Sequence, residues 1–124
     1  MTGRGAPSSL DALEAELRAI LVPYEDVLET GEIYGVEVLR RPGARAHDWF
    51  AGVRPGEGTV KLMLLPVHDH PELLEDVSPE LRKRKTGASL FTLRESDAGL
   101  LPELELLVQR SFVVYVGQPP GEER

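Results

Sequence analysis

Residues 59–67 constrain the fold more than any other part of the chain. Apolar side chains alternate between the two sides of this run, with Val60, Leu62 and Leu64 on one side and Met63 and Leu65 on the other. Alternation with a period of two is typical of a β-strand, and Lys61 is the single charge in the run. Because apolar residues occupy both sides, the run is predicted to be a central strand that is covered on much of both faces.

Three further segments are predicted to belong to the same sheet. Residues 26–40 carry spaced valine and isoleucine around a turn-like sequence, which indicates either one bent strand or two. Residues 47–53 and 88–93 also show strand patterns. In the first of these two segments, alternation is expected to place three side chains on one face: Trp49, Ala51 and Val53. Since short turns join most of the segments, we expect an antiparallel sheet of about five strands.

Helical spacing of apolar residues appears before and after the predicted sheet. Leucine and isoleucine recur every three or four residues over about 9–22, which predicts the first helix. A closing helix begins near Gly99 or Leu100, because a start at Ser96 would put Pro102 in the helix interior at a cost of about 3 kcal/mol. Both helices are expected to cover one face of the sheet through Leu13, Leu17, Ile20, Leu104, Val108 and Phe112.

The chain of 124 residues is long enough for one compact domain. Residues 9–116 are predicted to form this domain, of the α+β class, while residues 1–8 and 117–124 are expected to be flexible tails rich in small or polar residues. Residues 71–74 and 78–81 are predicted to be short helical connectors within the domain.

Composition excludes several classes of protein. The chain has no cysteine, which rules out disulfides, thiolate metal sites and cysteine nucleophiles. Its net charge of −7 argues against broad nucleic-acid binding and favours cations or basic partners. No apolar run approaches the ~20 residues of a membrane span, and residues 1–7 are not followed by the apolar core of a signal peptide. We therefore expect no membrane association and a cytoplasmic location.

Several short motifs carry a family resemblance: Trp49-Phe50-Ala51-Gly52, Leu64-Leu65-Pro66-Val67, Pro71-Glu72-Leu73-Leu74, Ser78-Pro79-Glu80-Leu81-Arg82-Lys83-Arg84, Gly87 and Phe91. With these motifs the chain resembles the YdhG-like domain family of bacterial proteins, over residues 10–115. The resemblance implies an α+β fold near the frataxin-like and YjbR-like folds. Some members of the family are described as iron chaperones, so the resemblance also implies a weak divalent-metal carrier.

Three positions depart from the pattern of that family. Met63 stands where the family usually has a histidine, and His68 stands where it often has a tyrosine. Ala88 replaces the lysine that follows Gly87 in the family, which removes a cation that could hold an anion there. A phosphate-binding role is weakened accordingly.

Acidic residues gather on the first predicted helix and strand. Clustered carboxylates are hard oxygen ligands for cations such as Fe(II), Mn(II) and Mg(II). The predicted metal ligands in this set are Glu25, Asp26, Glu29 and Glu32. The alternative interpretation is a solvated helix face on which Glu14 and Arg18 form an i,i+4 ion pair.

Histidine is confined to two places in the chain, His47 and the pair His68 and His70. Side chains two apart on an extended segment point the same way, so the pair is a second candidate for binding a metal. The alternative is an ordinary pair of solvated surface side chains.

A basic run stands out in the otherwise acidic chain: Arg82, Lys83, Arg84 and Lys85. Such a run is a candidate site for a phosphate, a nucleic-acid backbone or an acidic protein partner. In the alternative interpretation, Glu80 and the acidic residues upstream neutralise the run, and the cations offset the dipole of a short helix.

The sequence contains no known catalytic template, so we do not expect an enzyme. The aromatic residues are expected to be packing residues rather than the lining of a pocket: Tyr34, Trp49, Phe50 and Phe91. Two functional hypotheses remain. The first is a weak divalent-metal carrier, and the second is an interaction module without metal that docks a protein or, less favoured, a nucleic acid. The second would use the basic run or an open face of the sheet, where pairing with a second copy is an open alternative.

Overall fold

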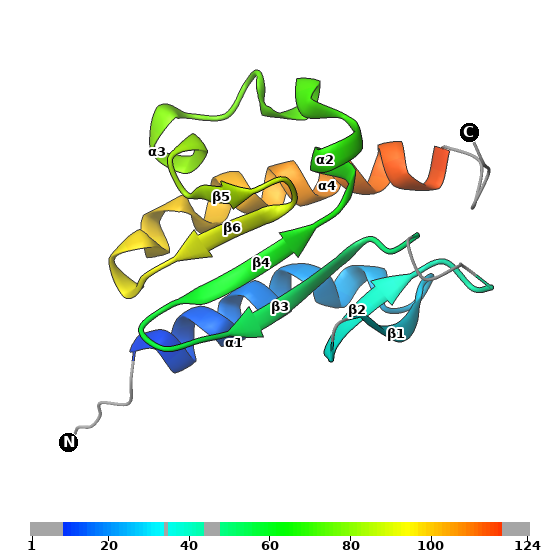
Figure 1. Ribbon diagram of the computed structural model, residues 1–124, viewed down its shortest axis with the longest axis horizontal. Helices are drawn as coiled ribbons and strands as arrows, with labels where there is room; N and C mark the ends of the chain where they lie inside the picture. The colour runs from blue at the N-terminus through cyan, green and yellow to red at the C-terminus, as the bar shows by residue number, and fades with distance from the viewer. Residues whose placement is uncertain (1–8, 34, 44–47, 118–124) are drawn as a thin grey trace.

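The computed structural model describes residues 9–33, 35–43 and 48–117 (Figure 1). Predictions for residues 1–8 and 118–124, for Tyr34 and for His47 lie outside these residues, whereas Gly117, predicted to begin the second tail, is the last residue of the closing helix. The helices are α1 (Ser9–Leu21), α2 (Pro66–Asp69), α3 (Pro79–Arg82) and α4 (Leu101–Gly117), and the 3-10 turns are η1 (Val22–Tyr24), η2 (Pro71–Leu74) and η3 (Glu95–Leu100). The strands are β1 (Glu29–Ile33), β2 (Val36–Arg40), β3 (Ala51–Pro55), β4 (Val60–Leu64), β5 (Lys85–Gly87) and β6 (Leu90–Leu93).

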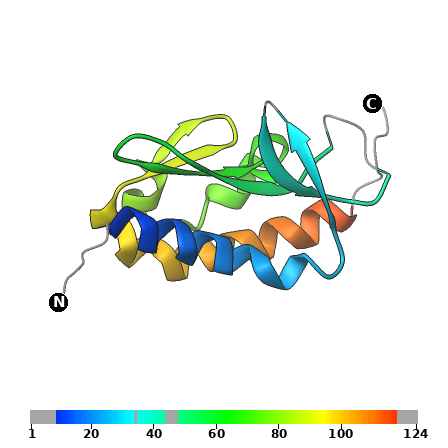
Figure 2. The same cartoon turned by 90° about the horizontal axis from the view of Figure 1, so that it is seen from below.

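The strands form one six-stranded antiparallel sheet in the order β1-β2-β3-β4-β6-β5. Both long helices lie on the same face of this sheet, as Figure 2 shows, so the predicted α+β class is confirmed. The segment 26–40 forms two strands rather than one. The additional strand, β5, begins at Lys85, the last residue of the predicted basic run, and pairs with β6 alone among the described strands.

The main core lies between the sheet and the two long helices. Leu62 and Leu64 of β4 are fully buried, as are Leu17 of α1 and both Leu104 and Val108 of α4. The remaining predicted core residues also pack there: Leu13 is buried, and Ile20 and Phe112 are partly buried against the core. Helical and strand periodicity therefore identified the core correctly.

The predicted ends of three strands were wrong by a few residues. The central strand ends at Leu64 rather than at residue 67, because Pro66 begins the short helix α2. The segment 47–53 becomes a strand only from Ala51, and the last strand begins at Leu90 rather than at residue 88.

Trp49 lies on the opposite face from the one predicted. It packs with Val38 and Met63 in a small apolar cluster on the face away from the long helices, whereas Ala51 and Val53 belong to the main core. The alternation is interrupted at Phe50, which is buried in the main core together with its neighbour Ala51. This irregular residue turns Trp49 to the other side of the sheet. Phe50 and Phe91 are fully buried, as expected for packing residues.

The end of α4 is tied to the base of the β1–β2 hairpin. The Tyr115 hydroxyl accepts a hydrogen bond from the Arg41 backbone N–H at 3.0 Å and donates one to the Asp48 carbonyl at 3.3 Å. The Arg41 guanidinium lies over the Tyr115 ring, 4.6 Å from its centroid, and contacts both Asp48 carboxylate oxygens, at 3.0 and 3.2 Å. Both contacts come from Arg41 Nη2, and this charge-assisted interaction stabilises a pair that has little exposure. It fixes where the hairpin leaves the sheet.

Candidate functional site

Pairing between β2 and β3 stops after two residues. The ladder joins Val38 to Gly52 and Leu39 to Ala51, whereas the β1–β2 and β3–β4 ladders each have five pairs. The backbones of Val38 and Gly52 face β1 and β4, so their pair is held by flanking bonds, one of them from Val53 N–H to the Glu37 carbonyl. Glu37 and Val53 do not form the next pair, so the reciprocal bond from Glu37 N–H to the Val53 carbonyl is absent from the ladder. We call this early end of the ladder the β2–β3 gap.

Gly52 explains why the two strands part. A Cβ atom at this position would lie 2.8 Å from the Glu37 carbonyl oxygen and 2.8 Å from Val38 Cγ1, closer than such contacts occur. The hairpin therefore crosses closely over β3 at a residue that has no side chain. Figure 2 shows the hairpin rising from the sheet on the side away from the long helices. Val36 and Glu37 leave the plane of β3 as a result.

Two backbone groups face each other at the end of the ladder without a bond in it, the Glu37 N–H and the Val53 carbonyl. Gly56 N–H donates to the Thr59 carbonyl in the β3–β4 turn, so alternation directs the N–H and C=O of Val53 away from β4 and toward β2. On the other side, the Leu39 carbonyl accepts from Phe50 N–H, so the backbone groups of Glu37, two residues earlier, also point toward β3. Pro55, which has no N–H, is tolerated in β3 at a position facing an unpaired edge.

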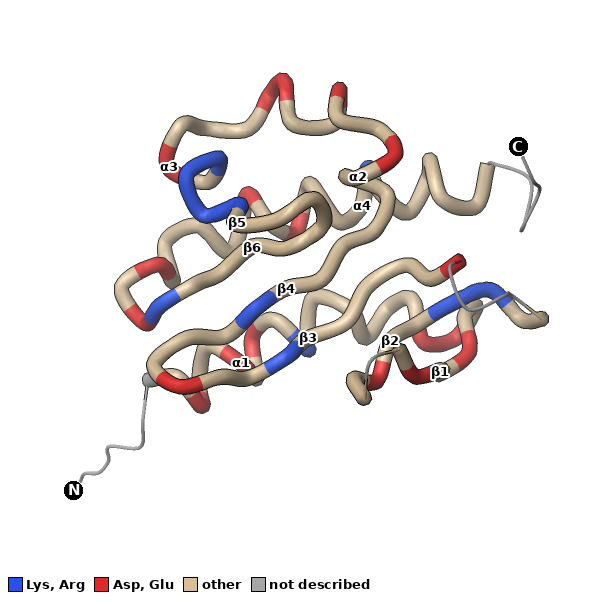
Figure 3. The backbone as a smooth tube through the Cα atoms, in the orientation of Figure 1, with Lys and Arg blue, Asp and Glu red and all other residues tan. Residues whose placement is uncertain are grey.

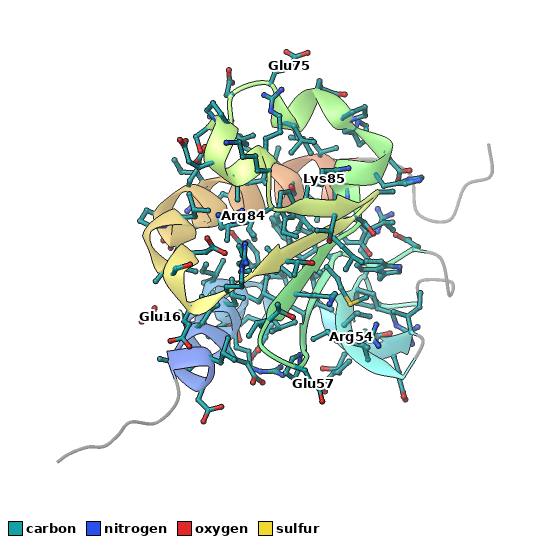
Figure 4. All side chains as sticks on the ribbon, turned by 60° about the vertical axis from the view of Figure 1, so that its left-hand side comes forward. Glu16, Arg54, Glu57, Glu75, Arg84 and Lys85 are labelled. Atoms are coloured by element: carbon teal, nitrogen blue, oxygen red, sulfur yellow. The ribbon has the colours of Figure 1, made fainter. Side chains whose placement is uncertain are left out.

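Two cavities adjoin the gap. One has a volume of about 350 Å³ and is lined by Arg18, Gly35, Val36, Glu37, Val53, Arg54 and Pro55. The other, of about 450 Å³, lies between the end of α1 and the hairpin, and is lined by Arg18, Leu21, Glu25, Thr30, Glu37, Val38, Leu39, Ala51, Gly52 and Val53. Both volumes fall in the range of about 300–1,000 Å³ that ligand pockets occupy. Figure 4 shows Arg54 beside the hairpin at this place.

Carboxylates dominate the charge around the gap. Glu32 and Glu37 lie directly opposite each other on β1 and β2, and together line a further hollow of the hairpin. Neither has an ion pair with another described residue, and Glu25 adds a third carboxylate to the larger cavity. Arg18 is compensated by Glu14, as predicted, with its Nη2 atom 2.7 Å from the carboxylate. The hairpin side of the gap is therefore negatively charged.

The predicted acidic metal ligands do not converge. Glu29 points to the opposite face of the hairpin from Glu32 and lies 3.5 Å from the Arg40 guanidinium. Asp26 is exposed, and Glu25 lies at the larger cavity. In the described part of the chain, no three histidine, aspartate or glutamate side chains are grouped to hold a metal ion. Metal binding by these residues stays a prediction.

The segment with His68 and His70 is not extended, as the argument for a shared metal assumed. His68 lies in α2, and His70 follows that helix. Each imidazole Nδ1 contacts a different carboxylate at 3.2 Å, His68 that of Asp69 and His70 that of Glu72. The two rings therefore have separate partners, because helical geometry does not align residues two apart.

Half of the basic run is bound within the molecule. Arg82 donates to the Leu74 carbonyl at 2.5 Å, and Arg84 donates to Asp97 at 2.9 Å, where Asp97 is 4% exposed. Asp97, rather than Glu80, is therefore the carboxylate that neutralises Arg84. Lys83 is exposed and Lys85 lies on β5 (Figures 3 and 4). These two lysines are therefore the residues of the run that could contact an acidic partner.

Comparison of the chain with protein-family models, with curated proteins and with solved structures gives no match. The resemblance to the YdhG-like family stays a prediction. Among the described residues, no helix is both long enough and apolar enough to cross a membrane.

Sequence reasoning identified Glu25 and Glu32 as candidate binding residues but missed Glu37, Val53 and Gly52. Glu37 looks like one ordinary polar residue of an alternating strand. The usable signal was the occurrence of both Gly52 and Pro55 in one strand segment, because glycine and proline within a strand mark a close approach or an unpaired edge.

Proposed function

We propose that this protein is an interaction module that binds an extended polypeptide segment in the β2–β3 gap. The observation that carries the proposal is the early end of the β2–β3 ladder, which leaves the Glu37 N–H and the Val53 carbonyl without a partner in that ladder. An extended segment adds to a sheet by making main-chain hydrogen bonds to such groups. This is the second hypothesis from the sequence, with the gap as the docking place.

The surroundings of the gap suit such a ligand. The larger cavity is lined by apolar side chains, Leu39 and Val53 from the sheet and Leu21 from α1, together with the charged Arg18, Glu25 and Glu37. Side chains of an extended segment alternate between two faces, so alternate residues would contact this lining while the backbone contacts the strand edges. Apolar contacts with a few fixed polar groups are typical of binding sites.

The test uses a short, neutral peptide of alternating threonine and valine, acetylated and amidated, with glutamine at its centre. We expect it to shift the backbone amide NMR signals of Glu37 and Val53. The variant Glu37→Pro removes an N–H that faces the gap, and we expect it to lose binding. Glu32→Pro is the matched control, because it removes the N–H of the opposite residue, which faces the outer edge of the sheet.

Thermal denaturation of both variants checks that they fold. Binding that is equally strong in folded Glu37→Pro would overturn the proposal. Signal shifts in the wild-type protein confined to the cluster of Val38, Trp49 and Met63 would overturn it without reference to any variant.

A further inference from the structure

Arg54 on β3 and Lys61 on β4 are directly opposite each other, and both lie on the open face of the sheet, away from the long helices. Together with Arg94, which follows β6, they form what we call the cationic cluster. We infer that this part of the open face is a second interaction surface, which binds an acidic polypeptide segment. The inference does not depend on the proposed function, because it uses the face of the sheet rather than the end of the β2–β3 ladder.

Strand alternation brings the three cations of the cluster together. Their neighbours in sequence are buried in the main core: Val53, Val60 and Leu93. Because side chains alternate along a strand and Arg94 keeps an extended backbone, all three cations point to the opposite face. Lys61 is paired with Arg54 on one side and with Thr92 on the other, so Arg94 is its diagonal neighbour. Cβ atoms are about 4.5–5.5 Å apart in a direct pair and within about 8 Å on the diagonal, so these like charges repel one another.

No carboxylate of the described chain neutralises the cluster. Arg54, Lys61 and Arg94 have no ion pair with any described residue, and neither do Glu57 and Glu95, the acidic residues closest to them in sequence. The other described arginines each bind a carboxylate or a carbonyl group: Arg18, Arg40, Arg41, Arg82, Arg84 and Arg110. The cluster therefore differs from the rest of the molecule, and an external carboxylate would relieve its repulsion.

The charge of this part of the open face opposes that of the whole chain. The outward-facing residues of β3, β4, β6 and β5 include two cations and no carboxylate: Gly52, Arg54, Lys61, Met63, Leu90, Thr92 and Thr86. Figure 3 shows the blue positions of β3 and β4 next to each other. In a chain with a net charge of −7, such a face attracts anionic groups locally.

An acidic polypeptide fits this face better than a nucleic acid does. Met63 and Leu90 are paired next to the cluster, and Leu90 is half-buried, so a peptide could place carboxylates on the cations and an apolar side chain beside Leu90. Bases of a single-stranded nucleic acid stack on exposed aromatic rings, whereas Trp49 on this face is 6% exposed and packs against Met63. The net charge of the chain also repels a long polyanion more than a short segment.

The test compares two acetylated and amidated peptides, one of alternating glutamate and serine around a central leucine, the other with glutamine in place of glutamate. We expect the glutamate peptide to bind about tenfold more tightly through a few exposed ion pairs, and the preference to weaken as salt is added. It should shift the backbone amide NMR signals of Lys61 and Thr92. Lys61→Gln should lose most of the preference. The matched control Arg110→Gln removes the same charge from α4, on the other face of the sheet (Figure 2), and should keep it.

Thermal denaturation checks that the variants fold, and Arg54→Gln, at an exposed position, replaces Lys61→Gln if the latter does not. Equal binding of the two peptides would overturn the inference, as would an equal loss of preference in Lys61→Gln and Arg110→Gln. A thymidine oligonucleotide that binds more tightly than the glutamate peptide, and less tightly to folded Lys61→Gln, would identify a nucleic acid as the occupant and overturn the inferred partner. Signal shifts confined to Glu37 and Val53 would overturn the inference while leaving the proposed function standing.

Discussion

Glu37 and Val53 occupy the first register position beyond the last β2–β3 pair, where the Glu37 N–H and the Val53 carbonyl face each other without joining the ladder. Every other neighbouring pair of long strands continues to its turn: β1–β2 ends at Ile33 and Val36, and β3–β4 ends at Pro55 and Val60. The opening therefore arises at one defined place in an otherwise regular part of the sheet.

Hydrogen exchange should detect the end of the ladder directly. The Glu37 amide faces β3 beyond the last pair and has no acceptor in the ladder, whereas the Leu39 amide faces β3 within it and donates to the Ala51 carbonyl. We expect the Glu37 amide to exchange much faster than that of Leu39. Exchange rates measured by NMR in the free protein check this, and equal protection of the two amides would contradict the early end of the ladder.

Replacing Gly52 by alanine should destabilise the protein. The new Cβ would lie 2.8 Å from the Glu37 carbonyl oxygen, a backbone atom that can move only with the whole hairpin. We expect a loss of about 1–3 kcal/mol in the free energy of unfolding, as for other overpacked sites. Urea denaturation measures it. Gly99→Ala is the control, because a Cβ there meets nothing within 4 Å, and a similar loss in both variants would contradict the close crossing.

The hydroxyl of Tyr115 should contribute to stability. Tyr115→Phe removes the hydrogen bonds to Arg41 N–H and to the Asp48 carbonyl in a site that is 1% exposed. We expect a loss of about 1–3 kcal/mol in the free energy of unfolding. Tyr24→Phe serves as the comparison, since Tyr24 contacts Phe50 and Phe112 through its ring. Equal effects of the two substitutions would show that the hydrogen bonds contribute nothing measurable.

That contribution should depend on pH in the alkaline range. Burial raises the pKa of Tyr115 from 10.0 to about 12 in the folded protein. Below the ordinary value both states keep the proton, so the contribution is complete. Above it the unfolded chain loses the proton first, and stability falls by about 1.4 kcal/mol per pH unit until the folded pKa is passed. The stability difference between wild type and Tyr115→Phe should therefore shrink as the pH rises; a constant difference would contradict the raised pKa.

Asp97 should be required for folding stability rather than for binding. It accepts from the Arg84 guanidinium and from the Arg94 backbone N–H while almost fully buried. Asp97→Ala leaves both donors without this acceptor, and we expect a loss of about 3 kcal/mol in the free energy of unfolding. Asp76→Ala is the control, because the Asp76 carboxylate is 78% exposed and lies 3.6 Å from Arg110. Thermal denaturation compares the two, and equal stability would mean that Arg84 is free for a partner.

Local periodicity made the two long helices and β4 predictable, because each covers its neighbours along one regular face. It could not reveal β5, whose three residues lack an apolar pattern and form a strand only by pairing with β6. Periodicity also could not predict which face of the sheet Trp49 occupies, since one irregular residue at Phe50 reverses the alternation.

The candidate site was less predictable than the fold for a related reason. Individual charges such as Glu25 and Glu32 could be selected from the sequence, but their grouping depends on how the hairpin crosses β3 at Gly52. Asp97 was not recognised as the partner of Arg84, because the two are 13 residues apart and meet only when η3 forms beneath β5.

The bond between Tyr115 and Arg41 spans 74 residues of chain. It gives the molecule an order of assembly as well as a structure. The base of the hairpin acquires its last hydrogen bonds only after α4 is present, so during synthesis the first two strands must wait for nearly the whole described chain to leave the ribosome. Contacts this distant in sequence slow folding. Until then the base of the hairpin lacks these two hydrogen bonds, so a nascent chain holds its first two strands by fewer contacts than the finished protein does.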